Sequence, residues 1–99
     1  MTEFQDRVLR LVLRVPRGRV TTYKGLARAL GKPRAYRAIA NVLARNPRSV
    51  EIPCHRVVRS NGKIGGYSLG TEQKAVLLNE EGVKIKGGRV NLRRYLFKF

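Results

Sequence analysis

The stretch TTYKGLARALGKPRAYRAIANVLAR, residues 21–45, decides which fold this chain can adopt. It holds two short amphipathic segments with a glycine and a proline between them. The first segment predicts a helix over residues 23–30 that stops at Gly31. The second predicts a helix from Pro33 to about Arg45, because proline suits the first turn of a helix. Two short helices joined by a brief glycine-containing turn form a helix-turn-helix motif.

The second helix of this motif has two faces that differ sharply. Small and apolar side chains follow the core spacing: Ala35, Ala38, Ile39, Val42 and Leu43. The opposite side carries an arginine and small or polar residues: Arg37, Ala40, Asn41 and Ala44. A purely solvated face would usually carry Glu and Lys, whereas small residues let a helix come close to another surface. The second helix is therefore the candidate recognition helix.

Further helices are expected on both sides of the motif. Side chains able to cap a helix precede the predicted helices: Thr2, Thr21 or Thr22, and Thr71. The first cap, with Gln5 at the third helical position, predicts a helix over residues 3–15. The last predicts a helix over residues 72–81 that stops at Gly82. The positions expected to face the core are Phe4, Val8, Leu11, Val12 and Val15 in one helix and Ala75, Val76 and Leu78 in the other.

Only a small amount of β-structure is expected. Two short apolar runs flank the segment 53–55: Val50 with Ile52, and Val57 with Val58. Residues 83–99 form a basic, partly apolar tail that is expected to pack back on the domain through Val90, Leu92, Tyr95, Leu96, Phe97 and Phe99. With 99 residues the chain is expected to be a single domain, 1–99. The predicted fold class is mainly α with a small β element, of the winged-helix-like, helix-turn-helix kind.

Charge is the strongest signal in the overall composition. The chain has 22 Lys and Arg against 6 Asp and Glu, a net charge of +16. No acidic residue occurs between Asp6 and Glu51, an interval that contains the whole helix-turn-helix. Such an excess favours a polyanionic partner, and nucleic acid before a membrane surface. The alternative is the solvated face of a generally arginine-rich protein.

Cys54 and His55 are the only cysteine and the only histidine, and they stand side by side after Pro53. The thiolate is the nucleophilic form of cysteine and an imidazole can take its proton, so the pair is a candidate nucleophile and base. The alternative is a buried, inert thiol with a hydrogen-bonded neighbour. A single cysteine excludes an intramolecular disulfide and a multi-cysteine zinc site. No apolar run is long enough to cross a bilayer, and we expect a cytoplasmic protein without a metal.

The stretch IGGYSLG, residues 64–70, predicts a glycine-rich loop. It lacks the Gly-Lys-Ser/Thr ending of a phosphate-binding loop. Its glycines instead let backbone groups approach a flat ligand closely, and an ordinary flexible loop is the alternative.

Together these motifs resemble the C-terminal domain of the O6-alkylguanine-DNA alkyltransferases. The residues that carry the resemblance are Pro53-Cys54-His55-Arg56-Val57, with Tyr23, Arg37, Asn46-Pro47, Gly65-Gly66-Tyr67-Ser68 and Glu80-Glu81-Gly82. The resemblance covers nearly the whole chain, from about Phe4 to the tail. It implies DNA repair by direct reversal: the alkyl group, typically methyl, moves irreversibly from O6 of guanine in double-stranded DNA to the cysteine after base flipping. It implies a monomer that needs no cofactor.

The family pattern assigns a chemical role to several residues. Cys54 would be the nucleophile and the alkyl acceptor, and His55 would deprotonate it through a water. Glu81 would orient His55, with Glu80 as the alternative if the helix phase differs by one residue. Tyr23 would donate to the ring of the leaving guanine. A thioether has no activated leaving group and the chain has no second thiol, so each molecule is expected to act once.

The resemblance also assigns contacts with DNA. Asn46 would tie the recognition helix to the active-site turn. The residues expected on the DNA-binding side are Arg37, which would replace the flipped nucleotide in the duplex, and Tyr36, Ala40, Asn41 and Thr22. The residues expected to hold the flipped base are Val57, through its backbone, and Gly65, Tyr67 and Ser68.

The sequence departs from the family pattern at a few positions. Tyr36 stands where a small residue is usual, and Asn41 replaces a glycine, which puts in doubt how closely the helix approaches DNA. Tyr36 could instead stack as a wedge in the duplex. Leu69 replaces a glycine, which puts in doubt whether bulky O6 adducts fit. The N-terminal domain of most family members is expected to be absent.

Two rival functions belong to other classes. Short alkyltransferase-like proteins flag lesions for another repair pathway without transferring the alkyl group. They generally carry tryptophan at the cysteine position, and this chain has no tryptophan, so Cys54 favours transfer. A helix-turn-helix transcription factor would read the major groove with Cys54 as inert core. That reading gives no reason for the positions of Tyr23, Asn46 and Glu81.

Overall fold

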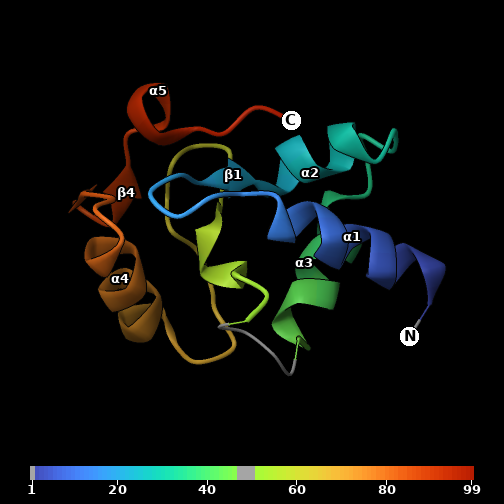
Figure 1. Cartoon of the computed structure of the whole chain (residues 1–99), viewed down its shortest axis with the longest axis horizontal. Helices are drawn as coiled ribbons and strands as arrows, with labels where there is room; N and C mark the ends of the chain where they lie inside the picture. The colour runs from blue at the N-terminus through green and yellow to red at the C-terminus, as the bar shows by residue number, and fades with distance from the viewer. Residues whose placement is uncertain (1, 47–50) are drawn as a thin grey trace.

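The computed structural model describes residues 2–46 and 51–99 and is mainly helical, as predicted (Figure 1). Its α-helices are α1 (Glu3–Leu13), α2 (Tyr23–Ala29), α3 (Tyr36–Ala44), α4 (Thr71–Glu80) and α5 (Leu92–Tyr95). One turn of 3₁₀-helix, η1, spans Cys54–Arg56. The strands form two pairs: β1 (Thr21–Thr22) with β2 (Val57–Val58), and β3 (Ile85–Lys86) with β4 (Arg89–Val90). None of these helices is long and apolar enough to span a membrane.

Threonine caps fix the starts of α1 and α2. Thr2 and Gln5 form a capping box, in which the backbone N–H of each residue donates to the side chain of the other. At α2 the cap is Thr22 rather than Thr21, because the Thr22 hydroxyl accepts the Gly25 N–H at 2.9 Å. Both helices therefore begin where their caps predict.

α3 differs from its prediction at its start and on one face. It begins at Tyr36 rather than at Pro33, because the Ala35 N–H donates to the Lys32 carbonyl and closes a separate turn first. Ala38 was expected in the core and is exposed. It directly precedes a buried position and therefore points about 100° away from it around the helix axis. The buried residues of α3 are Ile39 and Leu43.

α4 corrects two further expectations. The cap position is held by Gly70, at a φ of +95°, so Thr71 is the first helical residue and not the cap. Val76 was expected in the core and is 47% exposed. Lys74 and Leu78 are fully buried instead, and their spacing of four residues puts them on one face. Val76 lies halfway between them in sequence and so faces the opposite side.

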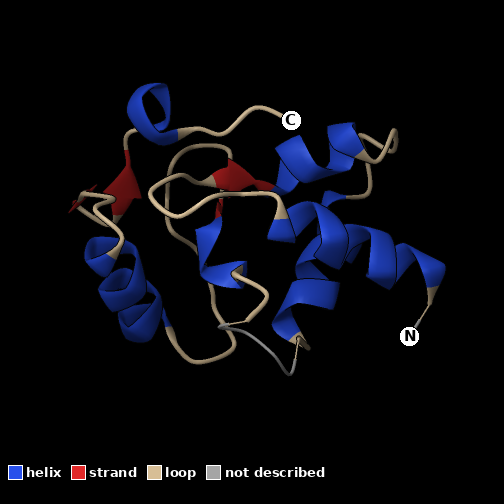
Figure 2. Cartoon of the chain, viewed as in Figure 1, coloured by secondary structure: helices blue, strands red, loops and turns tan. Residues whose placement is uncertain are grey.

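Two apolar cores lie on either side of the β1–β2 pair. The core between α1, α2 and α3 contains Val8, Leu9, Val12, Leu26, Ala27, Leu30, Ile39, Leu43, Cys54 and Val57. The core beneath α4 and the C-terminal segment contains Val20, Val58, Ile64, Leu78, Val83, Val90 and Tyr95. Neighbouring side chains of a strand point to opposite faces, which is why Val57 joins the first core and Val58 the second. Figure 2 shows the β1–β2 pair between these two groups of helices, and the second strand pair beside α4 at the edge of the molecule.

The β1–β2 pair joins two distant parts of the chain. The strands are parallel, with Thr21 opposite Val57 and Thr22 opposite Val58. Thr22 is also the cap of α2, and Val57 directly follows η1. The start of the helix-turn-helix is therefore hydrogen-bonded to the segment that carries the cysteine.

The C-terminal segment packs back on the domain, as predicted. The Val20 N–H donates to the Tyr95 carbonyl at 2.9 Å, and the Phe97 N–H donates to the Val20 carbonyl at 2.7 Å. Val90 and Tyr95 are buried, whereas Phe99 remains 38% exposed. The hairpin β3–β4, which the sequence did not predict, forms part of this segment. Val50, expected in an apolar run, lies outside the described residues.

Candidate active site

The cysteine lies in a tight turn whose shape is fixed by its backbone. Pro53 has φ −76° and ψ 65°, the values of an inverse γ-turn, and the Cys54 N–H donates to the Ile52 carbonyl at 2.7 Å. The Arg56 N–H donates to the Pro53 carbonyl at 2.9 Å and closes η1. Cys54 is only 4% exposed. The turn thus holds the sulfur at the edge of the helical core.

Asn46 connects the end of α3 to this sulfur. Its amide Nδ2 lies 2.8 Å from Cys54 Sγ and 3.5 Å from the Ile52 carbonyl oxygen. Burial raises the pKa of the Cys54 thiol, while the hydrogen bond from Asn46 and the charge of Lys74 offset part of that rise. The resting thiol is therefore protonated, and a base is needed to make it nucleophilic. Pro47, which belongs to the Asn46-Pro47 motif, lies outside the described residues.

A buried ion cluster lies next to the cysteine. Arg56 binds both carboxylate oxygens of Glu81, through Nε at 2.9 Å and a terminal nitrogen at 2.6 Å. Its other terminal nitrogen donates to the Val15 carbonyl at 2.8 Å. The Glu81 carboxylate also contacts His55 Nε2 at 3.0 Å. Glu80 is exposed, so Glu81 is the carboxylate that meets His55.

Opposite pKa effects act on the two members of the His55–Glu81 pair. Burial lowers the pKa of His55, although the carboxylate of Glu81 opposes this. For Glu81 burial would raise the pKa, but the hydrogen bonds from Arg56 and His55 outweigh burial and lower it. The pair is therefore a neutral imidazole beside an ionised carboxylate. The carboxylate accepts from Nε2–H, which leaves the lone pair on Nδ1, a buried atom without a hydrogen-bond partner among the described residues.

Lys74 is a second buried cation near the cysteine. It has no exposed surface, and its ammonium donates to the Val57 carbonyl at 2.7 Å and to the Gly66 carbonyl at 3.0 Å. Burial lowers the pKa of Lys74 to about 8, which still leaves it mainly charged at neutral pH. Lys74 therefore fastens the glycine-rich loop to the strand that follows the cysteine, and its charge favours the Cys54 thiolate.

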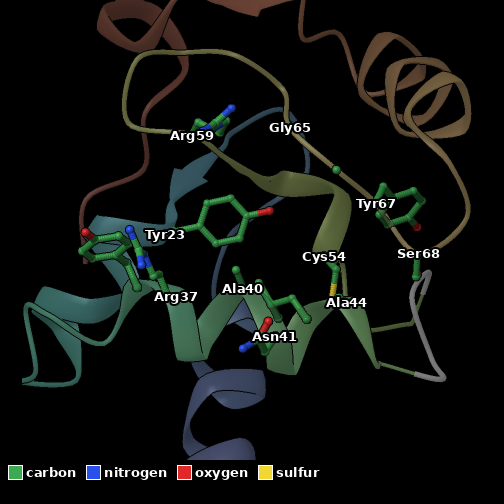
Figure 3. A pocket seen from close by; sticks show the side chains of 13 residues that line it. Tyr23, Arg37, Ala40, Asn41, Ala44, Cys54, Arg59, Gly65, Tyr67 and Ser68 are labelled. Atoms are coloured by element: carbon green, nitrogen blue, oxygen red, sulfur yellow. The ribbon is translucent and has the colours of Figure 1, made fainter.

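A cavity of about 750 Å³ opens beside the sulfur (Figure 3). The residues that line it are Tyr23, Tyr36, Arg37, Ala40, Asn41, Leu43, Ala44, Cys54, Arg59, Gly65, Gly66, Tyr67 and Ser68. α3 forms one wall, and the glycine-rich loop with Arg59 forms the opposite wall. Among the described residues the lining contains two guanidinium groups and no carboxylate. This composition suits an electron-rich or anionic ligand.

Two phenols stand on either side of the cysteine in Figure 3, Tyr23 and Tyr67. Burial, followed by the neighbouring Cys54, raises the pKa of Tyr23, and the charge of Arg59 opposes that rise. Burial and Cys54 raise the pKa of Tyr67 as well. Both hydroxyls therefore stay protonated at neutral pH, and they can act as hydrogen-bond donors to a ligand in the cavity.

The predicted recognition face of α3 lines the cavity. Arg37 and Asn41 are exposed, and Ala40 is half-buried between them along the wall. Tyr36 is half-buried, and the Lys24 ammonium lies 5.7 Å from the centre of its ring. Tyr36 and Asn41, which depart from the family pattern, are therefore part of the cavity wall.

The structure brings most of the predicted site residues together, with two exceptions. Val57 was expected to hold the base through its backbone; its side chain lies in the helical core and its carbonyl accepts from Lys74, so its contact with a base stays a prediction. Thr22 was expected to contact DNA; its hydroxyl caps α2 and it does not line the cavity, and the DNA contact stays a prediction. The described residues contain no group of three His, Cys, Asp or Glu side chains that could hold a metal ion.

Sequence reasoning missed Arg56, Arg59 and Lys74. The orientation of Arg59 could have been inferred from the sequence. Residues 57 and 59 of an extended segment face the same side, and Val57 was expected to face the interior. Lys74 gave no such signal, since a lysine among polar helix residues is usually solvated. Arg56 belongs to the cysteine motif, but only the folded chain brings it to Glu81.

One family model matches this chain, described as the DNA-binding domain of 6-O-methylguanine DNA methyltransferase, over residues 3–83. A methylated-DNA--protein-cysteine methyltransferase of Methanothermobacter thermautotrophicus is 49% identical over 87 residues, which cover 87% of this chain and 48% of the relative. The chain spans about half the length, or less, of the curated relatives it matches.

Solved structures of similar proteins include complexes with DNA. S. pombe Atl1, in complex with damaged DNA containing O6-carboxymethylguanine, has a TM-score of 0.91 and 32% identity, with 100% of this chain and 98% of that chain covered. Mycobacterium tuberculosis OGT in complex with DNA has a TM-score of 0.79 and 38% identity, with 82% of this chain and 50% of that chain covered. At these identities the similarity extends to the sequence as well as to the fold.

Proposed function

Because this chain belongs to the family of 6-O-methylguanine DNA methyltransferase DNA-binding domains, we propose that it moves an alkyl group from O6 of guanine to Cys54. Its substrate would be double-stranded DNA in which the damaged nucleotide has flipped into the cavity. The observation that carries the proposal is the cysteine: its thiol lines the cavity beside a hydrogen-bond donor at 2.8 Å and next to a His–Glu pair.

The first step is removal of the thiol proton. His55 is neutral, and Glu81 fixes the tautomer whose free lone pair is on Nδ1. The proton of Cys54 passes to Nδ1 through a water molecule. The resulting imidazolium is stabilised by the ionised Glu81, and the thiolate by the Asn46 amide and the Lys74 charge. The raised pKa of the thiol keeps it unreactive until this transfer takes place.

The second step is displacement at the alkyl carbon. The thiolate electron pair forms the Sγ–C bond, while the C–O6 bond breaks and its electrons move into the guanine ring. Tyr23, whose hydroxyl stays protonated, donates its proton to the ring of the leaving guanine. The proton taken by His55 later replaces the one that Tyr23 has lost. Overall the thiol becomes a thioether and the guanine is restored.

The product explains why each molecule would act only once. A thioether carbon has no activated leaving group, and Cys54 is the only cysteine in the chain. No second thiol can therefore remove the alkyl group. One alkyl group per protein is the expected stoichiometry.

DNA binding is proposed to occur through α3. Arg37 projects from the cavity wall on the exposed side of this helix and would enter the duplex where the nucleotide has left. The net charge of +16 favours phosphate contacts, so affinity should fall steeply with salt. Tyr36, held against Lys24, would support the wedge by stacking.

A second candidate function is binding of the lesion without transfer. It is favoured by Atl1, which matches over the whole of this chain and was crystallised with damaged DNA. In this case the cavity would hold the flipped base while Cys54 stayed unmodified. The buried thiol and its His55 neighbour argue for transfer, and a direct measurement separates the two functions.

The experiment is intact-protein mass spectrometry after incubation with a duplex oligonucleotide that contains O6-methylguanine. The expected result is a gain of one methyl group that saturates at one per protein and is absent from Cys54→Ala. Tight binding of the lesion duplex without any change in mass would contradict transfer and support the second candidate. No binding and no mass change would contradict both.

A further inference from the structure

Arg59 is a cation in the cavity wall that the proposed reaction leaves without a role. It directly follows β2 and lines the cavity opposite α3. Figure 3 shows it beside Tyr23, on the other side of that ring from Arg37 and α3. A molecule in the cavity would therefore have one guanidinium on each wall.

The backbone and stem of Arg59 are fixed by their surroundings. Its N–H donates to the Lys63 carbonyl, and its own carbonyl accepts from the Gly62 N–H, both at 2.9 Å. Its aliphatic stem lies on Gly65, where an added Cβ would come within 3.2 Å of the Arg59 Cγ. Gly65 leaves room for the stem because it has no Cβ, and its φ of +74° is a second reason for glycine at this position. These contacts hold the base of the side chain at the cavity wall, while the residue as a whole stays exposed.

The charge of Arg59 is not balanced within the site. Its guanidinium makes no hydrogen bond or ion pair with the described residues, and the cavity lining has no carboxylate. Arg56, three residues earlier, has every one of its nitrogens hydrogen-bonded. A cation that is positioned but unpaired at a ligand cavity is suited to bind an anion of the ligand.

We infer that Arg59 is a specificity-determining residue that binds an anionic oxygen brought into the cavity by the lesion nucleotide. The inference rests on the proposed function in that it needs a flipped nucleotide, but it does not need transfer. Two oxygens have the required chemistry: a phosphate next to the flipped nucleotide, and the carboxylate of an O6-carboxymethyl adduct. Arginine binds both through paired N–H donors.

The test measures the affinity for lesion duplex in a Cys54→Ala background, so that transfer cannot consume the ligand. Arg59→Gln is compared with Arg93→Gln, which removes the same charge from an exposed position on α5 outside the cavity. Three duplexes of one sequence are used, with guanine, O6-methylguanine or O6-carboxymethylguanine. Circular dichroism checks that both variants are folded.

Arg59→Gln is expected to weaken lesion binding about tenfold more than Arg93→Gln, and Arg59→Lys to restore part of the loss. An equal loss for the two lesions identifies the phosphate, and a loss confined to the carboxymethyl lesion identifies the adduct carboxylate. An equal loss on the undamaged duplex, or no excess over Arg93→Gln, overturns the inference. These outcomes do not depend on the mass measurement, so failure of alkyl transfer would be recognised separately.

Discussion

The charged side chains on the two sides of Cys54 differ in whether they are paired. On the protein side, the carboxylate of Glu81 holds Arg56 and His55, and all three side chains are largely shielded from solvent. On the cavity side, Arg37 and Arg59 are exposed, and none of the described residues that line the cavity carries a carboxylate to pair with them.

This difference separates two tasks of charged groups. A charge that orients a reacting group must be paired, because an unpaired buried charge costs several kcal/mol (about 3–5 when a partner is removed). A charge that binds a ligand must be unpaired before the ligand arrives, because an internal partner would compete. We therefore expect the paired charges on the protein side to contribute to stability and to the proposed chemistry, and the unpaired charges on the cavity side to contribute to binding.

The substitution Glu81→Gln is expected to have the largest effect, and it tests the paired charges on the protein side. The substitution leaves Arg56 without a carboxylate and His55 without its orienting partner. Alkyl transfer from a duplex containing O6-methylguanine should slow about 10²- to 10³-fold. The free energy of unfolding should fall by about 3 kcal/mol. Single-turnover kinetics and urea unfolding measure the two effects.

Glu80→Gln is the matched control, since the neighbouring carboxylate is exposed. It should leave the transfer rate and the stability nearly unchanged. If Glu80→Gln slowed transfer as much as Glu81→Gln, the assignment of the orienting carboxylate to Glu81 would be wrong.

Arg37→Gln tests the cavity side. Its guanidinium is exposed, so unfolding should be unaffected, while transfer from duplex DNA should slow about tenfold or more. Transfer from the free base O6-benzylguanine should not change, because a free base needs no flipping. The transfer rate is measured with both substrates. An equal loss of rate on both would mean that Arg37 takes part in the chemical step, and would contradict the assignment of the cavity-side charges to binding.

A smaller effect is expected in the pH dependence of the free energy of unfolding. The pKa of Glu81 lies below its ordinary 4.5, so the unfolded chain takes up this proton first and stability falls as the pH drops below 4.5. The pKa of His55 lies below its ordinary 6.5, so stability begins to fall already below pH 6.5. Both effects act in the same direction, so stability should fall continuously from pH 7 to pH 4. Urea unfolding across this range, in the wild type and in His55→Gln, should show a smaller slope in the variant near pH 6; equal slopes would contradict the assignment.

The smallest effect is expected for Leu69→Gly. The sequence suggested that Leu69 restricts bulky adducts, but its side chain is 55% exposed and does not line the cavity. The ratio of transfer rates for O6-benzyl and O6-methyl guanine in duplex DNA should therefore stay within about twofold. A larger change in that ratio would show that the loop folds over the cavity when DNA is bound.

The sequence predicted the parts of the fold that depend on local chemistry. The cap of α1 by Thr2 and the stop of α2 at Gly31 follow from side chains a few residues apart. The start of α3 and the cap of α4 were wrong, because a turn closed by Ala35 and a glycine cap at Gly70 have no strong local signal. Local rules thus give the helices, and they leave the ends uncertain by a few residues.

The site residues that belong to the family motif could be predicted from the sequence. The prediction missed residues that only tertiary contacts bring to the site. Cys54, Asn46, His55 and Glu81 do come together. The burial of Lys74 could not be predicted, because it depends on two carbonyls supplied by distant segments. The roles assigned to these residues in transfer stay predictions until the mass measurement is made.

The parallel pairing of β1 with β2 has a consequence for how the protein folds. The two strands enclose, between them, the helix-turn-helix and the cysteine turn. Closing such a long loop costs chain entropy before the contacts that it forms can stabilise the fold. This step is therefore expected to come late and slowly in folding. Until it does, the thiol is open to solvent with an ordinary pKa near 9.0 and without its hydrogen bond to Asn46. We therefore expect the thiol of the nascent chain to be most reactive toward oxidants and alkylating agents before this strand pair forms.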